Sequence, residues 1–198
     1  MLLTTADAQS VAPSSIPVHD LKLEPQLAYG VLGPLAEKYH VVIGISGKVM
    51  LDGVKEPLVK ISLRNGTLNQ VFDAIVAADP SYRWNTTSSG SVHFLVGEYR
   101  LPLLDVGVHV FDGKKLSRFD PLFVNQIPEV SAWLQKSNCV VNHEIVEVGS
   151  RPEEPSFEVH SKGAPFWAVL DAIALKSNQY FWALIQGRDK PCEMDVQF

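Results

Sequence analysis

The sequence repeats itself at one fixed spacing of 98 residues, with no gap needed to align the two copies. The sharpest match pairs the stretch 71–75, Val-Phe-Asp-Ala-Ile, with the stretch 169–173, Val-Leu-Asp-Ala-Ile. Such a period is too long for a solenoid repeat and close to the size of a small domain. We therefore predict a tandem duplication of one module. The recurring residues are Lys38/Lys136, Val42/Val140, Glu56/Glu154, Pro57/Pro155, Val71/Val169, Asp73/Asp171, Ala74/Ala172, Ile75/Ile173, Tyr82/Tyr180 and Trp84/Trp182.

Composition narrows the class of protein. The 198 residues are 46% hydrophobic and 20% charged, which suits two globular units that each bury a modest core. The net charge of -5 and the lack of a Lys/Arg run argue against a nucleic-acid surface, which needs clustered cations. No apolar run approaches the roughly 20 residues that span a bilayer. We therefore expect neither nucleic-acid binding nor a transmembrane segment.

Hydrophobic periodicity predicts the elements of the first copy. Helical spacing of apolar residues indicates a helix over 26–39 and a clearer one that begins near Leu68 and ends before Asp79. The stretch 44–47, Gly-Ile-Ser-Gly, matches neither a phosphate loop nor a nucleophile elbow, so we interpret it as a turn. The first copy therefore has the order β-α-β-β-α-β-β. Its predicted strands cover 16–23, 41–45, 58–63, 82–86 and 92–96.

The second copy repeats this order, and the predicted fold class is α+β. We expect two tandem β-α-β-β-α-β-β modules, each a small mixed sheet packed with two helices. The connector is short and apolar, so the modules should touch. The predicted strands of the second copy cover 108–111, 139–146, 157–159, 180–185 and 193–197, and its helices cover 124–136 and the residues after Pro165. The predicted domains are a flexible N-terminus (1–15), module 1 (16–97), a connector (98–105) and module 2 (106–198).

Two features bear on the cellular compartment. The first fifteen residues are rich in Ala, Ser and Thr, and Ala6-Asp7-Ala8 has the spacing of a signal-peptidase site. This segment is either the tail of an export signal or an ordinary flexible N-terminus, and we favour export. Cys139 and Cys192 both lie in the second copy, where each replaces an apolar strand residue. They form either two buried free thiols, which we favour, or a disulfide.

The sequence offers little catalytic chemistry. None of the six histidines has a metal-ligand spacing, and Asn142-His143-Glu144 lacks the second histidine of a zinc helix. The recurring Asp73 and Asp171 are interpreted as solvated or cap-bonding helix residues, because an acid catalyst also needs a base and a pocket. We therefore expect no metal, no cofactor and no enzymatic activity.

Aromatic residues are the candidates for binding. The pairs Tyr82/Trp84 and Tyr180/Trp182 should each lie on one sheet face, where packing on the helices explains them without a ligand. Trp167 and Phe181 stand where the first copy has polar residues, so they mark either the contact between the modules, which we favour, or a partner site. Trp133 replaces an apolar residue of the first copy and is predicted in the core.

The motif around the second helix of each copy resembles a known family. Thr67-Leu68, the helix 71–75 and Tyr82-Arg83-Trp84 follow an alternating strand and a turn. The corresponding residues of the second copy are Pro165-Phe166, 169–173 and Tyr180-Phe181-Trp182. This pattern is similar to the secretin and TonB N-terminus short domain, also known as the N0 domain of secretins. The resemblance implies a periplasmic protein-protein adaptor without catalytic residues.

Three hypotheses follow. The first is a non-catalytic exported adaptor for an envelope secretion, transport or signalling system. Its partner would be a receptor, a secretin or a regulator, bound by strand addition or on an apolar patch. The second is a small-molecule or glycan binder that uses the cleft between the modules. The third, ranked lowest, is a hydrolase.

Structural features distinguish these hypotheses. A cleft lined with Tyr, Trp and convergent polar groups favours the ligand, and a polar groove beside an unpaired strand favours the adaptor. A nucleophile bonded to a histidine would favour the hydrolase. The sequence leaves the oligomeric state open.

Overall fold

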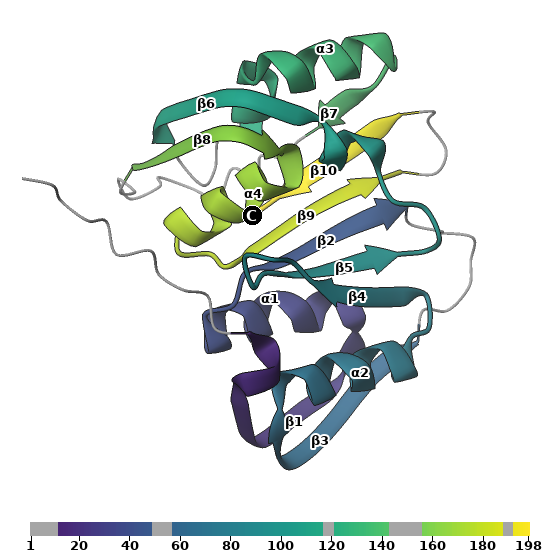
Figure 1. Cartoon of the computed structure of the whole chain (residues 1–198). Coiled ribbons are helices and arrows are strands. Elements are labelled where there is room, and N and C mark those ends of the chain that lie inside the picture. Colours follow the sequence, from purple (N-terminus) through teal and green to yellow (C-terminus); the bar gives the residue numbers. More distant parts are fainter. Residues whose placement is uncertain (1–11, 49–56, 117–120, 143–155, 188–191) are drawn as a thin grey trace, which may run out of the picture.

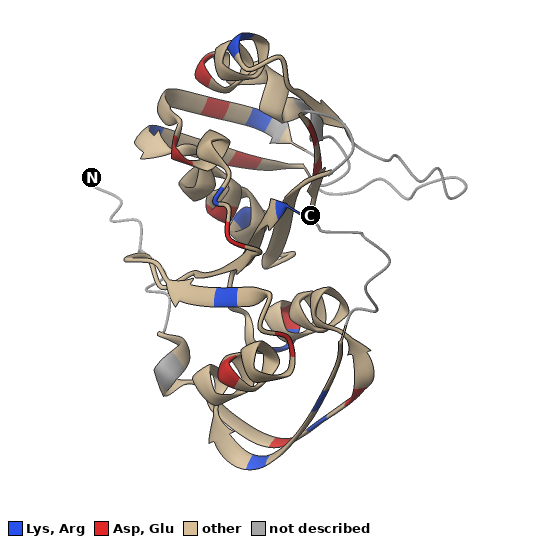
Figure 2. Cartoon of the chain, turned by 90° about the vertical axis from the view of Figure 1, so that its right-hand side faces the viewer, with Lys and Arg blue, Asp and Glu red and all other residues tan. Residues whose placement is uncertain are grey.

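The computed structural model describes residues 12–48, 57–116, 121–142, 156–187 and 192–198. Within these ranges the chain has four α-helices and several small groups of strands, so the predicted α+β class is confirmed. None of the helices in these ranges has the length and hydropathy needed to cross a membrane. Figure 2 shows acidic and basic residues interspersed along the described elements of both halves.

Both halves of the chain have the order β-α-β-β-α-β-β. The first half consists of β1 (Pro17–Leu27), α1 (Ala28–Tyr39), β2 (Ile43–Lys48), β3 (Leu58–Thr67), α2 (Leu68–Ala78), β4 (Tyr82–Thr86) and β5 (Val92–Val96). The second half consists of β6 (Gly107–Leu116), α3 (Pro128–Lys136), β7 (Val140–Asn142), β8 (Phe157–Pro165), α4 (Phe166–Lys176), β9 (Phe181–Gln186) and β10 (Glu193–Gln197). Three 3₁₀ turns accompany them, at Pro13–Ser15, Pro102–Asp105 and Pro121–Gln126.

Some element bounds differ from the sequence prediction. The first helix begins at Ala28 because β1 continues through Leu27, which pairs with Leu58 of β3. The helix predicted over 124–136 is divided, and α3 begins only at Pro128. Proline suits a first helical turn and keeps the residue before it out of the α conformation. Beyond β7, the strand predicted over 139–146 lies outside the described residues.

The two halves share one sheet, whereas we predicted a separate small sheet for each module. The strands follow the order β4-β5-β2-β9-β10-β7 in a single six-stranded sheet (Figure 1). β1 pairs with β3, and β6 with β8, in separate antiparallel ribbons. The halves meet at the parallel pair β2–β9, which runs in register from Ile43↔Phe181 to Lys48↔Gln186. Backbone hydrogen bonds therefore join the halves.

The helices of the two halves cover opposite faces of this shared sheet. Side chains alternate along a strand, so neighbours point to different faces. Ile43 and Ile45 of β2 lie in the core of the first half together with Ala183 of β9. Trp182 of β9 lies in the core of the second half together with Val42. β9 therefore contributes to both cores, and Val42, the residue before β2, brings the first half into the second core.

Gly44 lies at the centre of the shared sheet, so the interpretation of 44–47 as a turn is wrong. The residue is part of β2 and is in register with His93 of β5 and with Trp182 of β9. A Cβ atom on Gly44 would lie 2.2 Å from Cζ2 of Trp182. Gly47 has φ 149°, and a Cβ there would lie 2.2 Å from the carbonyl oxygen of Val96. Both glycines serve close packing within a strand rather than a turn.

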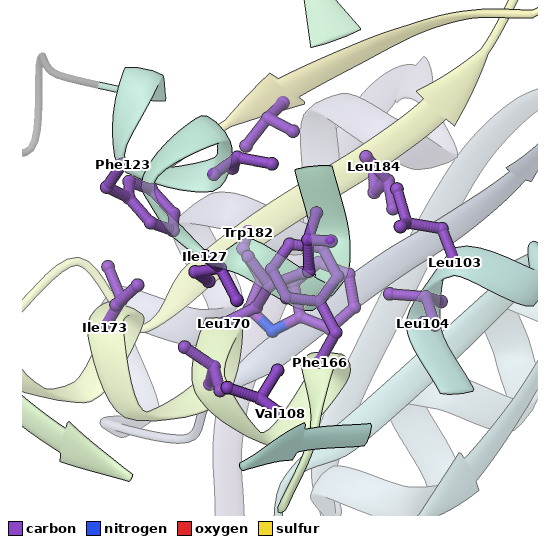
Figure 3. Packing of buried hydrophobic residues seen from close by; sticks show 14 of the residues in the cluster. Leu103, Leu104, Val108, Phe123, Ile127, Phe166, Leu170, Ile173, Trp182 and Leu184 are labelled. Carbon is purple, nitrogen blue, oxygen red and sulfur yellow. The ribbon is translucent and has the colours of Figure 1, made fainter. Parts of the chain in front are cut away.

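The core of the second half forms around Trp182, which is 1% exposed. Figure 3 shows its ring among Phe166, Leu170 and other apolar side chains. The connector contributes Leu103 and Leu104 to this core, so it packs on the second half. Trp133, which we predicted in the core, is half-buried and packs against the same cluster.

A disulfide joins Cys139 and Cys192, which corrects our preference for two free thiols. The two residues precede neighbouring parallel strands, β7 and β10. The amide of Val140 donates to the carbonyl oxygen of Cys192 at 2.9 Å, and the two Cα atoms of the cysteines lie 4.5 Å apart. This separation is within the range that a disulfide spans.

Gly44→Ala should destabilise the protein by about 1–3 kcal/mol, because the new methyl group would overlap the Trp182 ring in a packed core. The control is Gly30→Ala in α1, where a Cβ would meet its nearest atom, Oε1 of Gln26, at 3.5 Å. That change should stabilise by about 0.5–1 kcal/mol because alanine favours a helix. Urea unfolding measures both, and equal effects would contradict the role given to Gly44.

Removal of the disulfide should lower the free energy of unfolding by about 4 kcal/mol, from loop-closure entropy over a sequence separation of 53. The variant is the double substitution Cys139→Ala and Cys192→Ala, compared with wild-type protein in urea with and without reductant. Alkylation of native protein prepared without reductant, followed by mass spectrometry, checks the bridge. Two alkylated thiols would show that it does not form.

Candidate functional site

A cleft of about 790 Å³ lies where the two halves meet. The first half supplies its 3₁₀ turn and the start of β1, the end of α1 and the turn between β4 and β5. The second half supplies one face of α4 and the residue before β9. The cleft is lined by Ser15, Ile16, Pro17, Tyr39, His40, Val41, Val42, Ser88, Ser89, Gly90, Ser91, Trp167, Ala168, Asp171, Ala172, Leu175 and Tyr180.

One wall of the cleft is a face of α4. Trp167, Asp171 and Leu175 follow each other at intervals of four residues, so they lie on the same side of the helix. Ala168 and Ala172 lie beside them and leave room next to the larger side chains. Leu175 is 44% exposed and adds apolar surface to this wall. The second half therefore presents an apolar wall that contains one carboxylate.

Two residues with left-handed backbone conformations project into the cleft. His40 ends α1 with φ 49°, and Tyr180 precedes β9 with φ 57°. Their rings meet edge to face with centroids 5.0 Å apart. Asn138, the residue that corresponds to His40 in the second half, has φ 51°. Asparagine tolerates this conformation, whereas histidine there costs about 1 kcal/mol or more.

Tyr180 does not lie on the sheet face with Trp182, contrary to our prediction. β9 begins one residue later, and the amide of Tyr180 donates to the carbonyl oxygen of Ala174 at the end of α4. The left-handed turn redirects the side chain from the sheet to the cleft. Its counterpart Tyr82 starts β4 and is 8% exposed.

Asp171 is the centre of a buried polar cluster, so its interpretation as a solvated or cap-bonding residue is wrong. The residue is 6% exposed. Its Oδ1 accepts a hydrogen bond from Nε1 of Trp182 at 2.6 Å, and Nε2 of His93 lies 3.0 Å from Oδ1 and 3.2 Å from Oδ2. His93 lies between the rings of Trp167 and Trp182, at centroid distances of 5.2 and 5.3 Å. This cluster connects β5 of the first half with α4 and β9 of the second.

The first half has a simpler version of this contact. Asp73 accepts a hydrogen bond from Nε1 of Trp84 at 3.0 Å, but Asp73 is exposed and Trp84 is half-buried. The same Asp and Trp therefore recur in both halves because one hydrogen bond joins the helix to the strand. Asp171 and Trp182 are buried because they lie where the two halves meet.

Serine hydroxyls form the other polar part of the cleft. Oγ1 of Thr87 and Oγ of Ser89 lie 2.7 Å apart, and Oγ of Ser89 lies 3.1 Å from Oγ of Ser91. Gly90 has φ 86°, which allows the tight turn between β4 and β5. The hydroxyl chain therefore has a fixed geometry at the edge of an otherwise apolar space.

Trp167 and Phe181 both lie at the contact between the halves, as we favoured. The Trp167 ring contacts His93 of β5, and the Phe181 ring lies 5.9 Å from that of Tyr29 in α1. The Tyr29 hydroxyl also donates to Oε1 of Gln197 in β10, and burial raises the pKa of this hydroxyl. The halves are therefore joined by side chains as well as by backbone pairing.

Of the six predicted binding residues, Trp167 and Tyr180 line the cleft. Phe181 packs between the halves, and the other three belong to or pack against the hydrophobic cores. We did not predict His40, Asp171 or the serines as site residues. The clearest signal available was His93, a polar residue in the middle of an apolar strand over 92–96.

Three of the described histidines contact carboxylates. His93 contacts Asp171, His109 contacts Glu129, and His160 contacts Asp112. These partners are carboxylates rather than nucleophilic hydroxyls. Among the described residues, no three His, Cys, Asp or Glu side chains form a group that could hold a metal ion.

No protein family model, no curated protein and no solved structure matches the chain.

Asp171→Ala should destabilise the protein much more than Asp73→Ala. The first change leaves the buried N–H groups of Trp182 and His93 without their acceptor, at about 1–3 kcal/mol for each group. The second removes an exposed contact and should cost about 0.5 kcal/mol. Urea unfolding of both variants measures the difference. Similar losses would show that Asp171 does not hold the halves together.

Proposed function

We propose that this protein is a non-catalytic, exported binding protein whose small ligand occupies the cleft between its halves. The observation that carries this proposal is that both halves together form a cavity lined by Tyr39, Tyr180, Trp167 and convergent polar groups. A cleft with Tyr, Trp and convergent polar groups is what we expect of a small-molecule or glycan binder. Ligand sites also occur preferentially where two units meet.

The size and lining of the cleft suit a small organic molecule. Its volume of about 790 Å³ lies within the range of about 300–1,000 Å³ that is typical of ligand pockets. Apolar side chains such as Val41 and Leu175 provide most of the contact surface, and the hydroxyls of the 88–91 turn provide hydrogen-bonding groups. This division supports a ligand with an apolar body and a polar group.

The walls of the cleft are held in place before any ligand binds. The parallel β2–β9 pair fixes the two halves in register, and the cluster of His93, Asp171 and Trp182 fixes α4 against that sheet. A preformed site loses little conformational entropy on binding. This rigidity supports a binding role for the cleft.

Two observations support export. Structural disulfides such as Cys139–Cys192 persist mainly in oxidising compartments. The resemblance to the secretin and TonB N-terminus short domain implies the periplasm. We therefore place the ligand in the periplasm or another compartment outside the cytoplasm.

An adaptor role is the second candidate, and β4 supports it. Within the described residues, β4 is one of the two outer strands of the shared sheet, and β7 is the other. Trp84 on β4 is half-buried, whereas its counterpart Trp182 is covered by the backbone of Gly44 in the adjacent strand. A partner strand added beside β4 would cover Trp84 in the same way. An envelope protein with an extended segment is therefore the partner that this edge suits.

Binding of the neutral dye N-phenyl-1-naphthylamine tests the cleft. We expect saturable, one-to-one binding with a rise in dye fluorescence, because the dye has an apolar aromatic body. Ala168→Phe fills the space beside Trp167 and should weaken binding at least tenfold. The control is Ala77→Phe on the exposed face of α2, which should bind the dye as the wild type does. Absence of saturable binding, or an equal effect of both substitutions, would contradict the cleft proposal.

A further inference from the structure

The described residues of the cleft lining carry formal charge of one sign, which is negative. Among the described residues that line the cleft, Asp171 is the single carboxylate, and none is Lys or Arg. His40 is the other titratable group of the lining near physiological pH, and a neutral imidazole adds no charge. The formal charge of the described lining is therefore negative, and these residues offer no cation to an anionic ligand.

Two side chains outside the cleft lining hold the carboxylate of Asp171 in place. Trp182 donates from its indole N–H to Oδ1, and Nε2 of His93 lies 3.0 Å from the same oxygen. These contacts fix the position of Asp171, which also lines the cleft. A carboxylate in a largely apolar cavity favours a positive partner strongly, because the surroundings screen charges less than water does.

The remaining lining can accept the rest of an organic cation. Trp167 and the two tyrosines, Tyr39 and Tyr180, provide aromatic rings on both walls, and such rings attract cations as well as apolar groups. An ammonium group has three N–H donors and no acceptor. The oxygens of Ser89 and Ser91 line the same cavity and can accept such donors.

We infer that the cleft binds small organic cations, namely protonated amines that carry an aromatic or aliphatic body, and rejects the corresponding carboxylates. This inference rests on the cleft function proposed above and names the ligand class for it. The negative lining sets the preference between charged groups, and the apolar walls set the requirement for a body of sufficient size.

Three probes with the same body test the inference: 4-phenylbutylamine, 4-phenylbutan-1-ol and 4-phenylbutyrate. Each is titrated into the full chain at pH 8, where an imidazole is neutral. Isothermal titration and displacement of N-phenyl-1-naphthylamine measure the affinities. We expect the amine to bind at least tenfold tighter than the carboxylate, with the alcohol between them. Added salt should reduce the difference, because screening weakens the attraction to Asp171.

Asp171→Asn removes the charge and keeps the size of the side chain and an oxygen acceptor for Trp182. We expect the amine to lose its advantage over the alcohol in this variant. Asp73→Asn changes the corresponding exposed residue of the first half and should keep the wild-type order of affinities. Thermal melting checks that both variants fold, and the order of the three probes on wild-type protein decides the inference even where Asp171→Asn fails to fold.

The outcomes separate this inference from the proposed function. Equal affinities for the three probes, or tightest binding of the carboxylate, would overturn the cation preference while dye binding in the cleft stands. Dye binding without binding of the amine would overturn it as well. Failure of both the dye and all three probes to bind would contradict the cleft function itself.

Discussion

The absence of a side chain at Gly44 is the constraint on which the join between the halves depends. With only a hydrogen at this position, the indole of Trp182 lies directly against the backbone of β2. His93 and Trp182 are in register with Gly44 on either side, so both reach Asp171 across the gap that the glycine leaves. Any larger residue would push β9 or its tryptophan away. The position of α4, and with it one wall of the cleft, follows from this contact.

The two halves show how one local contact acquires two roles. A helix aspartate accepts a hydrogen bond from a strand tryptophan eleven residues later in both halves. In the first half the pair lies at the surface. In the second half the strand β2 covers the tryptophan, and His93 adds another polar contact to the aspartate. The chemistry of Asp171 therefore comes from its neighbours in the first half rather than from its own sequence motif.

Local patterns predicted the elements whose structure depends on local sequence. The bounds of β4, β5 and β10 agree with the alternation of apolar residues, and α2 has the apolar face that its spacing indicated. Features set by distant residues escaped prediction. The sequence around Gly44 is typical of a turn, and the reason for a glycine there is the ring of Trp182, which is distant in the sequence. The two cysteines become neighbours only because β7 pairs with β10. In the candidate site, Trp167 could be predicted because it stands where the first copy has a polar residue. The left-handed backbone at Tyr180 could not be predicted from the sequence.

The join between β2 and β9 also has a geometric consequence for the number of units. β9 corresponds to β4, and β2 corresponds to β7, so the halves associate head to tail through two different surfaces. Such a heterologous contact does not close on itself, and in principle it can be extended by further units into a polymer. The two outer strands, β4 and β7, differ from β9 and β2 at two positions of this contact. Asn142 replaces the essential glycine on β7, and Arg83 replaces Phe181 on β4. Neither outer strand therefore repeats the residues that form the contact between β2 and β9.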